Sequence, residues 1–193
     1  MKCIILAGGL GTRLAEETTT KPKPMVKIGK HPILWHIMKI YSSFGINDFI
    51  ICTGYKKEII EKYFKKDFVK TESSNFKHYY NEKNKWKICC AFTGHNTQTA
   101  GRLHKVKKLL KKEKYFFLTY GDGLANVNIK KTLNFFKKYK KLSLVTSVKP
   151  PARYGVIKIE KHLVKRFEEK IDNKDVWING GFFIFNIEVL KLI

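Results

Sequence analysis

The stretch Leu6-Ala7-Gly8-Gly9-Leu10-Gly11-Thr12-Arg13-Leu14 is the most informative part of this 193-residue chain. It directly follows the short apolar run from Lys2 to Leu6, which predicts a fully buried strand stopped by glycines. Glycines let the backbone turn sharply and leave main-chain N–H groups free to bind phosphate oxygens. Arg13 adds a permanent forked cation at the end of the loop. The stretch therefore predicts a strand that runs into a phosphate-binding loop.

The spacing of this loop excludes two other phosphate-binding motifs. A Walker A loop places Lys and then Ser or Thr after its last glycine, whereas Gly11 is followed by Thr12 and Arg13. A dinucleotide fingerprint that begins at Gly9 and Gly11 requires a third glycine at the position of Leu14. The pattern that fits is G-G-x-G-T-R-L.

A second motif, Lys21-Pro22-Lys23-Pro24-Met25, follows the loop closely. Because proline restricts its own backbone and that of the preceding residue, we expect Lys21 and Lys23 to be extended, with side chains on the same side. A lysine held beside a phosphate loop neutralises the charge that develops during phosphoryl or nucleotidyl transfer. Lys23 is therefore a candidate catalytic and nucleotide-binding residue.

Apolar periodicity along the chain predicts alternating strands and helices. We expect strands at 2–6, 48–52, 76–80, 86–92, 115–120, 142–148, 155–160, 163–168 and 176–185, and helices at 32–44, 57–64, 101–110 and 129–139. A tight turn at Lys161-His162 is expected between the strands at 155–160 and 163–168. This order favours an α/β fold of the Rossmann-like, doubly wound type, with a mixed, mainly parallel sheet and extra antiparallel strands. With no linker, residues 1–193 are expected to form one domain. Because the chain ends inside an amphipathic pattern at 190–193, we expect that domain to lack its C-terminal part.

Asp122 is the leading candidate for a metal ligand. It follows the aromatic-rich strand predicted at 115–120 and stands between Gly121 and Gly123. Ligands of such sheets collect beyond the carboxyl ends of the strands, and a carboxylate there suits Mg²⁺, which bridges carboxylate and phosphate oxygens. The alternative is a simple Asp-Gly turn without a ligand.

Bulk composition limits the partners. The formal net charge is +23, but only four of the 39 basic residues are arginine, whereas specific nucleic-acid readers rely on arginine forks. We expect solvated lysine faces and no specific nucleic acid, with weak nonspecific polyanion binding as the alternative. No apolar run approaches the roughly 20 residues of a membrane helix, so no membrane partner is expected. Four cysteines without C-x-x-C spacing fit a reducing cytoplasm.

These motifs resemble those of the sugar-1-phosphate nucleotidyltransferases, and most closely the branch that transfers a cytidylyl group to glucose 1-phosphate. The resemblance spans nearly the whole chain, and its first loop is the most specific part. The residues that carry it are 5–14, 21–25, Pro32-Ile33-Leu34-Trp35-His36-Ile37-Met38, Thr93-Gly94, Gly101-Arg102-Leu103, Thr119-Tyr120-Gly121-Asp122-Gly123 and Ile178-Asn179-Gly180-Gly181-Phe182-Phe183.

The resemblance assigns roles to individual residues. It implies that Asp122 holds Mg²⁺, that Thr97 and Arg102 belong to a base-reading loop, and that the glycine loop with Lys23 and Gly121 binds the nucleotide. Four residues would hold the sugar phosphate: Gly155, Glu169, Lys170 and Asn179. Two departures from the family pattern stand out. Ile171 replaces a usual proline, and no residue of this chain matches the family's second metal aspartate.

The implied reaction converts CTP and α-D-glucose 1-phosphate to CDP-glucose and pyrophosphate, with Arg13, Lys23 and Asp122 as catalytic residues. Such a product serves activated-sugar biosynthesis for surface polysaccharide, such as the O-antigen of lipopolysaccharide. A homo-oligomer is compatible with the sequence. Three alternatives remain: another pair of nucleotide and sugar, with dTTP or UTP; a truncated nucleotide-binding module without turnover; and a lysine-rich polyanion-binding protein.

Overall fold

The computed structural model describes residues 1–9, 20–67, 69–73, 76–150, 156–168 and 176–193, with side chains at all of these except 66–73, 156–159 and 167–168. The chain divides into two compact units. The first comprises Met1–Leu144 and Gly181–Ile193, and the second comprises Val145–Gly180. The candidate phosphate loop therefore belongs to the first unit.

An eight-stranded sheet has the order β5-β6-β7-β4-β1-β8-β12-β9. Its strands are β1 (Lys2–Ala7), β4 (Asp48–Thr53), β5 (Val69–Ser73), β6 (Phe76–Asn81), β7 (Trp86–Phe92), β8 (Tyr115–Tyr120), β9 (Ser143–Val148) and β12 (Ile178–Asn186). Strand β1 pairs in parallel with β4 and β8, and β4 pairs in parallel with β7. Strand β6 pairs antiparallel with β5 and β7, and β12 pairs antiparallel with β8. The prediction of a doubly wound, mainly parallel sheet with added antiparallel strands is confirmed.

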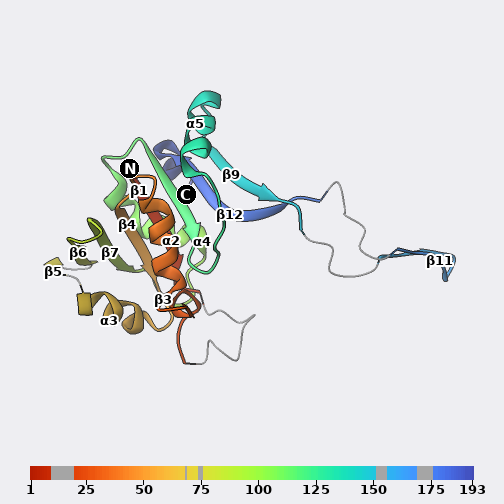
Figure 1. Ribbon diagram of the computed structural model, residues 1–193. Helices are drawn as coiled ribbons and strands as arrows, with labels where there is room; N and C mark the ends of the chain where they lie inside the picture. The colour runs from red at the N-terminus through yellow and green to blue at the C-terminus, as the bar shows by residue number, and fades with distance from the viewer. Residues whose placement is uncertain (10–19, 68, 74–75, 151–155, 169–175) are drawn as a thin grey trace. The chain divides into compact units, whose positions relative to one another are not determined.

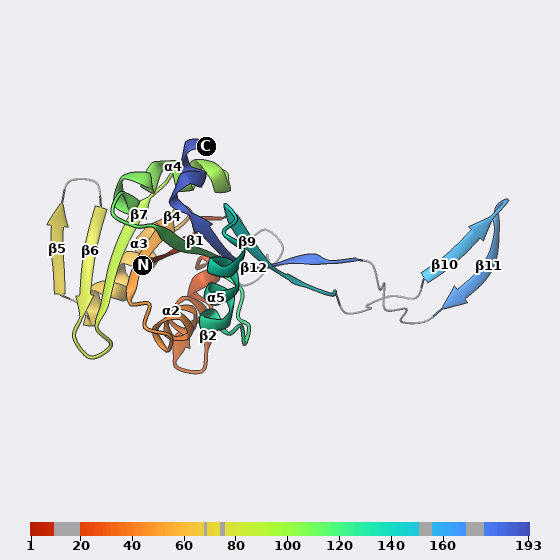
Figure 2. The ribbon, with the colours of Figure 1, turned by 90° about the horizontal axis from the view of Figure 1, so that it is seen from above.

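Helices cover both faces of this sheet, as Figures 1 and 2 show. One face carries α2 (Ile33–Ser42), α3 (Lys57–Asp67) and α5 (Ile129–Tyr139), whose apolar residues join one core cluster. The other face carries α4 (Thr99–Val106) and the 3-10 helices η3 (Lys107–Leu110) and η4 (Ile187–Lys191), which pack in a second cluster. A strand between two such layers must be apolar on both sides, which explains the unbroken apolar run at the N-terminus.

Strand β1 links the two cores. Cys3 and Ile5 point into the first cluster and Ile4 into the second, and all three are fully buried. Full burial of one such isoleucine contributes roughly 1.5–3 kcal/mol. All four cysteines are buried, and burial raises the pKa of both Cys52 and Cys89 to about 12. Their thiols therefore act as small apolar groups rather than nucleophiles.

The structure corrects one local prediction. Lys23 is not extended, because Lys23–Met25 forms the 3-10 helix η2, closed by the Met25 N–H donating to the Pro22 carbonyl at 2.8 Å. Proline is tolerated in the first turn of a helix, because the N–H group that it lacks has no partner there. The turn therefore forms although the residue before a proline usually prefers an extended backbone. Three short strands were not predicted: the hairpin of β2 (Lys27–Ile28) and β3 (His31–Pro32), and strand β5.

The second unit contains the antiparallel hairpin of β10 (Val156–Glu160) and β11 (Leu163–Glu168). Its two turn residues, Lys161 and His162, have positive φ of 47° and 67°, which matches the twist of a tight hairpin. The predicted tight turn at this position is confirmed. Among the described residues, no helix is long and apolar enough to cross a membrane.

Candidate functional site

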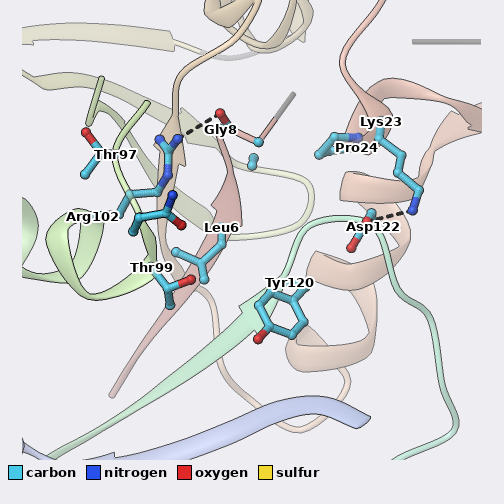
Figure 3. Close-up of a pocket in the computed structure, with 12 residues that line it drawn as sticks. Leu6, Gly8, Lys23, Pro24, Thr97, Thr99, Arg102, Tyr120 and Asp122 are labelled. Carbon is cyan, nitrogen blue, oxygen red and sulfur yellow. Dashed lines mark hydrogen bonds and ion pairs between the residues drawn. The ribbon is translucent and has the colours of Figure 1, made fainter. Parts of the chain in front are cut away.

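A cavity of about 240 Å³ lies at the carboxyl ends of β1 and β8. Its walls come from the start of the glycine loop, from η2, from the segment leading into α4, and from the turn after β8. The lining residues are Leu6, Ala7, Gly8, Gly9, Lys23, Pro24, Thr97, Gln98, Thr99, Arg102, Tyr120 and Asp122. Figure 3 shows Thr97 and Arg102 on one wall and Lys23 and Asp122 on the other. This is the edge at which parallel α/β sheets bind their ligands.

Gly8 begins the phosphate loop in direct contact with a buried guanidinium. Its carbonyl accepts a hydrogen bond of 2.9 Å from Nη2 of Arg102. A Cβ atom at this position would lie 2.1 Å from Nη1 of Arg102 and 2.9 Å from the backbone nitrogen of Gly54. Only glycine leaves room for the guanidinium here, so the first part of the motif serves close packing as well as phosphate access.

Arg102 is the centre of a hydrogen-bond network that joins three segments of the chain. Its side chain comes from α4, the residue is 5% exposed, and burial lowers the pKa of its guanidinium. Besides the Gly8 carbonyl, the guanidinium donates to four acceptors: the carbonyls of Thr53, Gly94 and His95 and the Oγ1 of Thr93. A buried charge requires such pairing, and here neutral acceptors supply it.

The opposite wall carries an ion pair between two residues that are 99 positions apart. Nζ of Lys23 lies 2.8 Å from Oδ2 of Asp122, with side chains 25% and 40% exposed. The turn of η2 presents the lysine, and the turn after β8 presents the aspartate. The Gly121 N–H donates to the Leu6 carbonyl at 2.9 Å, which fixes the aspartate turn against β1. The two residues predicted to handle phosphate charge therefore meet at one cavity.

Asp122 fits the role of a Mg²⁺ ligand in one respect. Its carboxylate is partly exposed at a cavity that also carries the start of the phosphate loop. Within the described residues, no group of three or more His, Cys, Asp or Glu side chains is placed to hold a metal. Mg²⁺ commonly takes one or two carboxylates together with substrate phosphates and water, so a single carboxylate suits a metal that arrives with a nucleotide.

The predicted site residues fall into three groups. The cavity brings together eight of them: Leu6, Ala7, Gly8, Gly9, Lys23, Thr97, Arg102 and Asp122, with Gly121 beside it. Asn179 is an exposed residue of β12 in the second unit. The remaining seven lie outside the described residues: Leu10, Gly11, Thr12, Arg13, Gly155, Glu169 and Lys170. Their roles stay predictions.

The sequence assigned no individual site role to three residues of the site: Thr93, Lys105 and Tyr120. Thr93 donates from Oγ1 to the Thr53 carbonyl at 2.9 Å and accepts from Arg102 at 2.7 Å. Lys105 contacts the same segment from α4, and Tyr120 lines the cavity. Lys105 could have been found from the sequence, because it follows Arg102 by three residues, a spacing that places both side chains on one face of a helix.

The comparisons with known proteins agree with this geometry. Residues 2–193 match the model of the family described as nucleotidyl transferase. The glucose-1-phosphate cytidylyltransferase of Salmonella typhi is 45% identical over 200 residues, covering 100% of this chain and 78% of that protein. This chain belongs to the nucleotidyl transferase family. Other members are more distant: the mannose-1-phosphate guanyltransferase of Hypocrea jecorina is 32% identical and is covered over 51% of its length.

Two solved structures share the fold. HddC from Yersinia pseudotuberculosis superimposes with a TM-score of 0.70 at 24% identity, covering 100% of this chain and 79% of that one. UDP-glucose pyrophosphorylase complexed with UDP-glucose superimposes with a TM-score of 0.67 at 22% identity, with coverage of 99% and 78%. At these identities the likeness extends to the fold alone.

Proposed function

We propose that this nucleotidyltransferase converts CTP and α-D-glucose 1-phosphate to CDP-glucose and pyrophosphate. The observation that carries the proposal is one cavity that holds the start of the phosphate loop, Lys23 and Asp122 together with the segment around Thr97. The relative at 45% identity over the full chain, itself a glucose-1-phosphate cytidylyltransferase, supports CTP and glucose 1-phosphate as the substrates. Its product would serve the biosynthesis of surface polysaccharides such as the O-antigen.

In the proposed reaction, a phosphate oxygen of glucose 1-phosphate attacks the α-phosphorus of CTP in line. A new phosphorus–oxygen bond forms, the bond to the bridging oxygen breaks, and pyrophosphate leaves with the electron pair. The attacking oxygen is already anionic, so no general base is required. Positioning and charge neutralisation then provide the catalysis.

The described residues have defined tasks in this scheme. Lys23, whose Nζ lies at the cavity, would donate hydrogen bonds to the phosphates in transfer, and Asp122 would hold Mg²⁺. When bound, this ion would neutralise charge on the phosphate oxygens. The ion pair between Lys23 and Asp122 keeps both charged groups at the cavity. Arg13 and Lys170 remain the predicted ligands of the leaving pyrophosphate and of the sugar phosphate.

A single assay tests the proposal. The full chain is mixed with Mg²⁺, glucose 1-phosphate and CTP, UTP, dTTP, GTP or ATP in turn, and pyrophosphate release is measured. Release with CTP alone is expected. Release with dTTP or UTP instead would replace the nucleotide in the proposal. Tight CTP binding without release would identify a nucleotide-binding module, and salt-sensitive DNA retention without nucleotide preference would identify a polyanion-binding protein.

A further inference from the structure

The segment from Thr93 to Gln98 joins β7 to α4 without regular secondary structure of its own. Its last two residues, Thr97 and Gln98, line the cavity. Carbonyl groups of such a segment need partners outside a helix or sheet ladder. The partners come from α4, which begins directly after the segment and turns two cationic side chains back onto it.

The two cations hold different ends of the segment. Arg102 reaches its beginning, with hydrogen bonds to Thr93 Oγ1 and to the carbonyls of Gly94 and His95. Lys105 spans the segment. Its Nζ donates to the Thr93 carbonyl at 2.9 Å and to Oγ1 of Thr97 at 3.3 Å. Of the two, Lys105 alone has a described contact with the cavity-lining threonine.

The side chain of Thr97 fits into a space that is left open because residue 94 is a glycine. Gly94 has a φ of +98°, and a Cβ there would lie 2.7 Å from Oγ1 of Thr97 and 3.3 Å from Nζ of Lys105. A side chain at Gly94 would therefore displace both partners of the contact. An ammonium group can only donate, so the Thr97 hydroxyl must accept from Lys105 and keeps its own hydrogen for another acceptor.

We propose that Lys105 is a positioning residue that holds Thr97 and thereby sets the nucleotide-base wall of the cavity. This inference rests on the proposed function, because it assumes that the Thr97 wall faces the base. Arg102 ties the same segment to Gly8 and so to the phosphate loop, whereas Lys105 has no described hydrogen bond to that loop. Loss of Lys105 is therefore expected to disturb base recognition and to leave phosphate recognition intact.

The test compares Lys105→Met with Lys105→Arg and with Lys108→Met as a matched control. Lys108 is an exposed residue of η3 with no hydrogen bond or ion pair to the described residues. Calorimetry with Mg²⁺ measures the dissociation constants of CTP and UTP, and of pyrophosphate as a ligand without a base. Lys105→Met should weaken CTP binding about five- to tenfold and lower the preference for CTP over UTP, while pyrophosphate affinity stays unchanged. Lys105→Arg should recover most of the loss, and Lys108→Met should match the parent protein.

A double-mutant cycle with Thr97→Val isolates the contact itself. If Lys105 acts through Thr97, the double variant should bind CTP no more weakly than the worse single variant. Additive losses, or equal weakening of CTP and pyrophosphate by Lys105→Met, would overturn the proposal. An unchanged CTP affinity in Lys105→Met would do the same.

Amide hydrogen exchange separates this proposal from the proposed function. In the ligand-free protein, Lys105→Met should speed exchange across residues 93–97 and leave β1 and β8 unchanged. If the parent protein binds no CTP, the proposed function fails, and the exchange measurement still decides whether Lys105 holds the segment. Unchanged exchange at 93–97 would refute the positioning role whatever the nucleotide result.

Discussion

The parallel strands of the sheet carry a cavity at each end, and the two cavities differ in how their polar groups are used. The one at the carboxyl ends, of about 240 Å³, contains the buried Arg102 network and the Lys23–Asp122 pair. The one at the amino ends, of about 360 Å³, is lined by Lys2, Asp48, Ile50, His78, Tyr79, Tyr80, Lys87, Ile88, Cys89 and Leu109. The phosphate-loop motif and the Lys23 and Asp122 motifs therefore surround the smaller of these two cavities.

The two edges of the sheet differ in which segments of the chain meet there. At the carboxyl ends, three connecting segments meet so closely that Gly8 must lack a side chain. At the amino ends, three of the polar groups stand at the starts of parallel strands, with Lys2 opposite Asp48 and Asp48 opposite Lys87, and others come from the antiparallel strand β6. Lys2 and Asp48 are 3.8 Å apart, a distance of weak pairing. The volume of a cavity therefore does not by itself indicate a ligand site. Loops that meet around the same buried polar side chain are the better indication.

The largest contrast is expected between two Asp→Asn variants, one at each edge. Asp122→Asn removes the carboxylate proposed to hold Mg²⁺ and should reduce the rate of pyrophosphate release by about 100-fold or more. Asp48→Asn, at the opposite edge, should leave that rate unchanged. Steady-state assays with saturating CTP and glucose 1-phosphate make the comparison. Comparable loss in both variants would mean that the two edges are not functionally distinct.

Removal of the buried guanidinium should produce the next largest effect. Arg102→Met leaves the acceptors of Thr93, Gly94 and Gly8 without their donor and should lower the free energy of unfolding by about 2–4 kcal/mol. Arg102→Lys should recover little, because one ammonium cannot reach acceptors on three segments. Urea unfolding followed by circular dichroism measures both variants. Full stability of Arg102→Lys would show that a single cation is enough.

A matched pair of glycine variants probes how tightly the phosphate loop packs. Gly8→Ala should destabilise by about 1–3 kcal/mol, because its Cβ would overlap Nη1 of Arg102. At Gly9, which is exposed, no described atom lies within 4 Å of a Cβ, so Gly9→Ala should melt near the parent temperature. Thermal unfolding of both variants decides the point. Equal melting temperatures would contradict the packing role of Gly8.

The smallest effect concerns pH and the amino-terminal edge. Burial, the main cause, raises the pKa of Asp48 above its usual value, and the nearby Lys2 opposes the shift only partly. The pKa of Asp48 is higher in the folded state than in the unfolded state, so the folded protein holds this proton more tightly. The resulting contribution to the free energy of unfolding is complete at pH values below the unfolded pKa. It is lost as the pH rises through the folded pKa.

Asp48→Asn should therefore raise the melting temperature at pH 7 by at most about 2 °C, and this gain should disappear near pH 3. Melting curves across this pH range measure the difference. A gain that is larger in acid than at neutral pH would show that the sign is wrong.

Local patterns were enough to predict most of the secondary structure. The apolar run of β1, the helical spacing of α2 and the turn at Lys161 and His162 were all recognised, because each depends on neighbours within a few residues. The strand β5 and the hairpin of β2 and β3 were missed. They are short, and pairing with adjacent strands rather than a distinctive local pattern defines them.

By itself, the sequence determined the fold class, the phosphate-loop motif and the two charged residues, Lys23 and Asp122, that now form the pair. Only the tertiary structure decided that these two meet, because 99 residues separate them and the order of strands brings them together. Arg102 shows the same limit: the family resemblance implied a place in a base-reading loop, and only the structure shows that both terminal nitrogens of its guanidinium donate to carbonyl or hydroxyl groups of the protein. A buried cation forms hydrogen bonds with whichever acceptors lie around it. For Arg102 these acceptors come from three segments that are distant in the sequence, so the tertiary structure decides them.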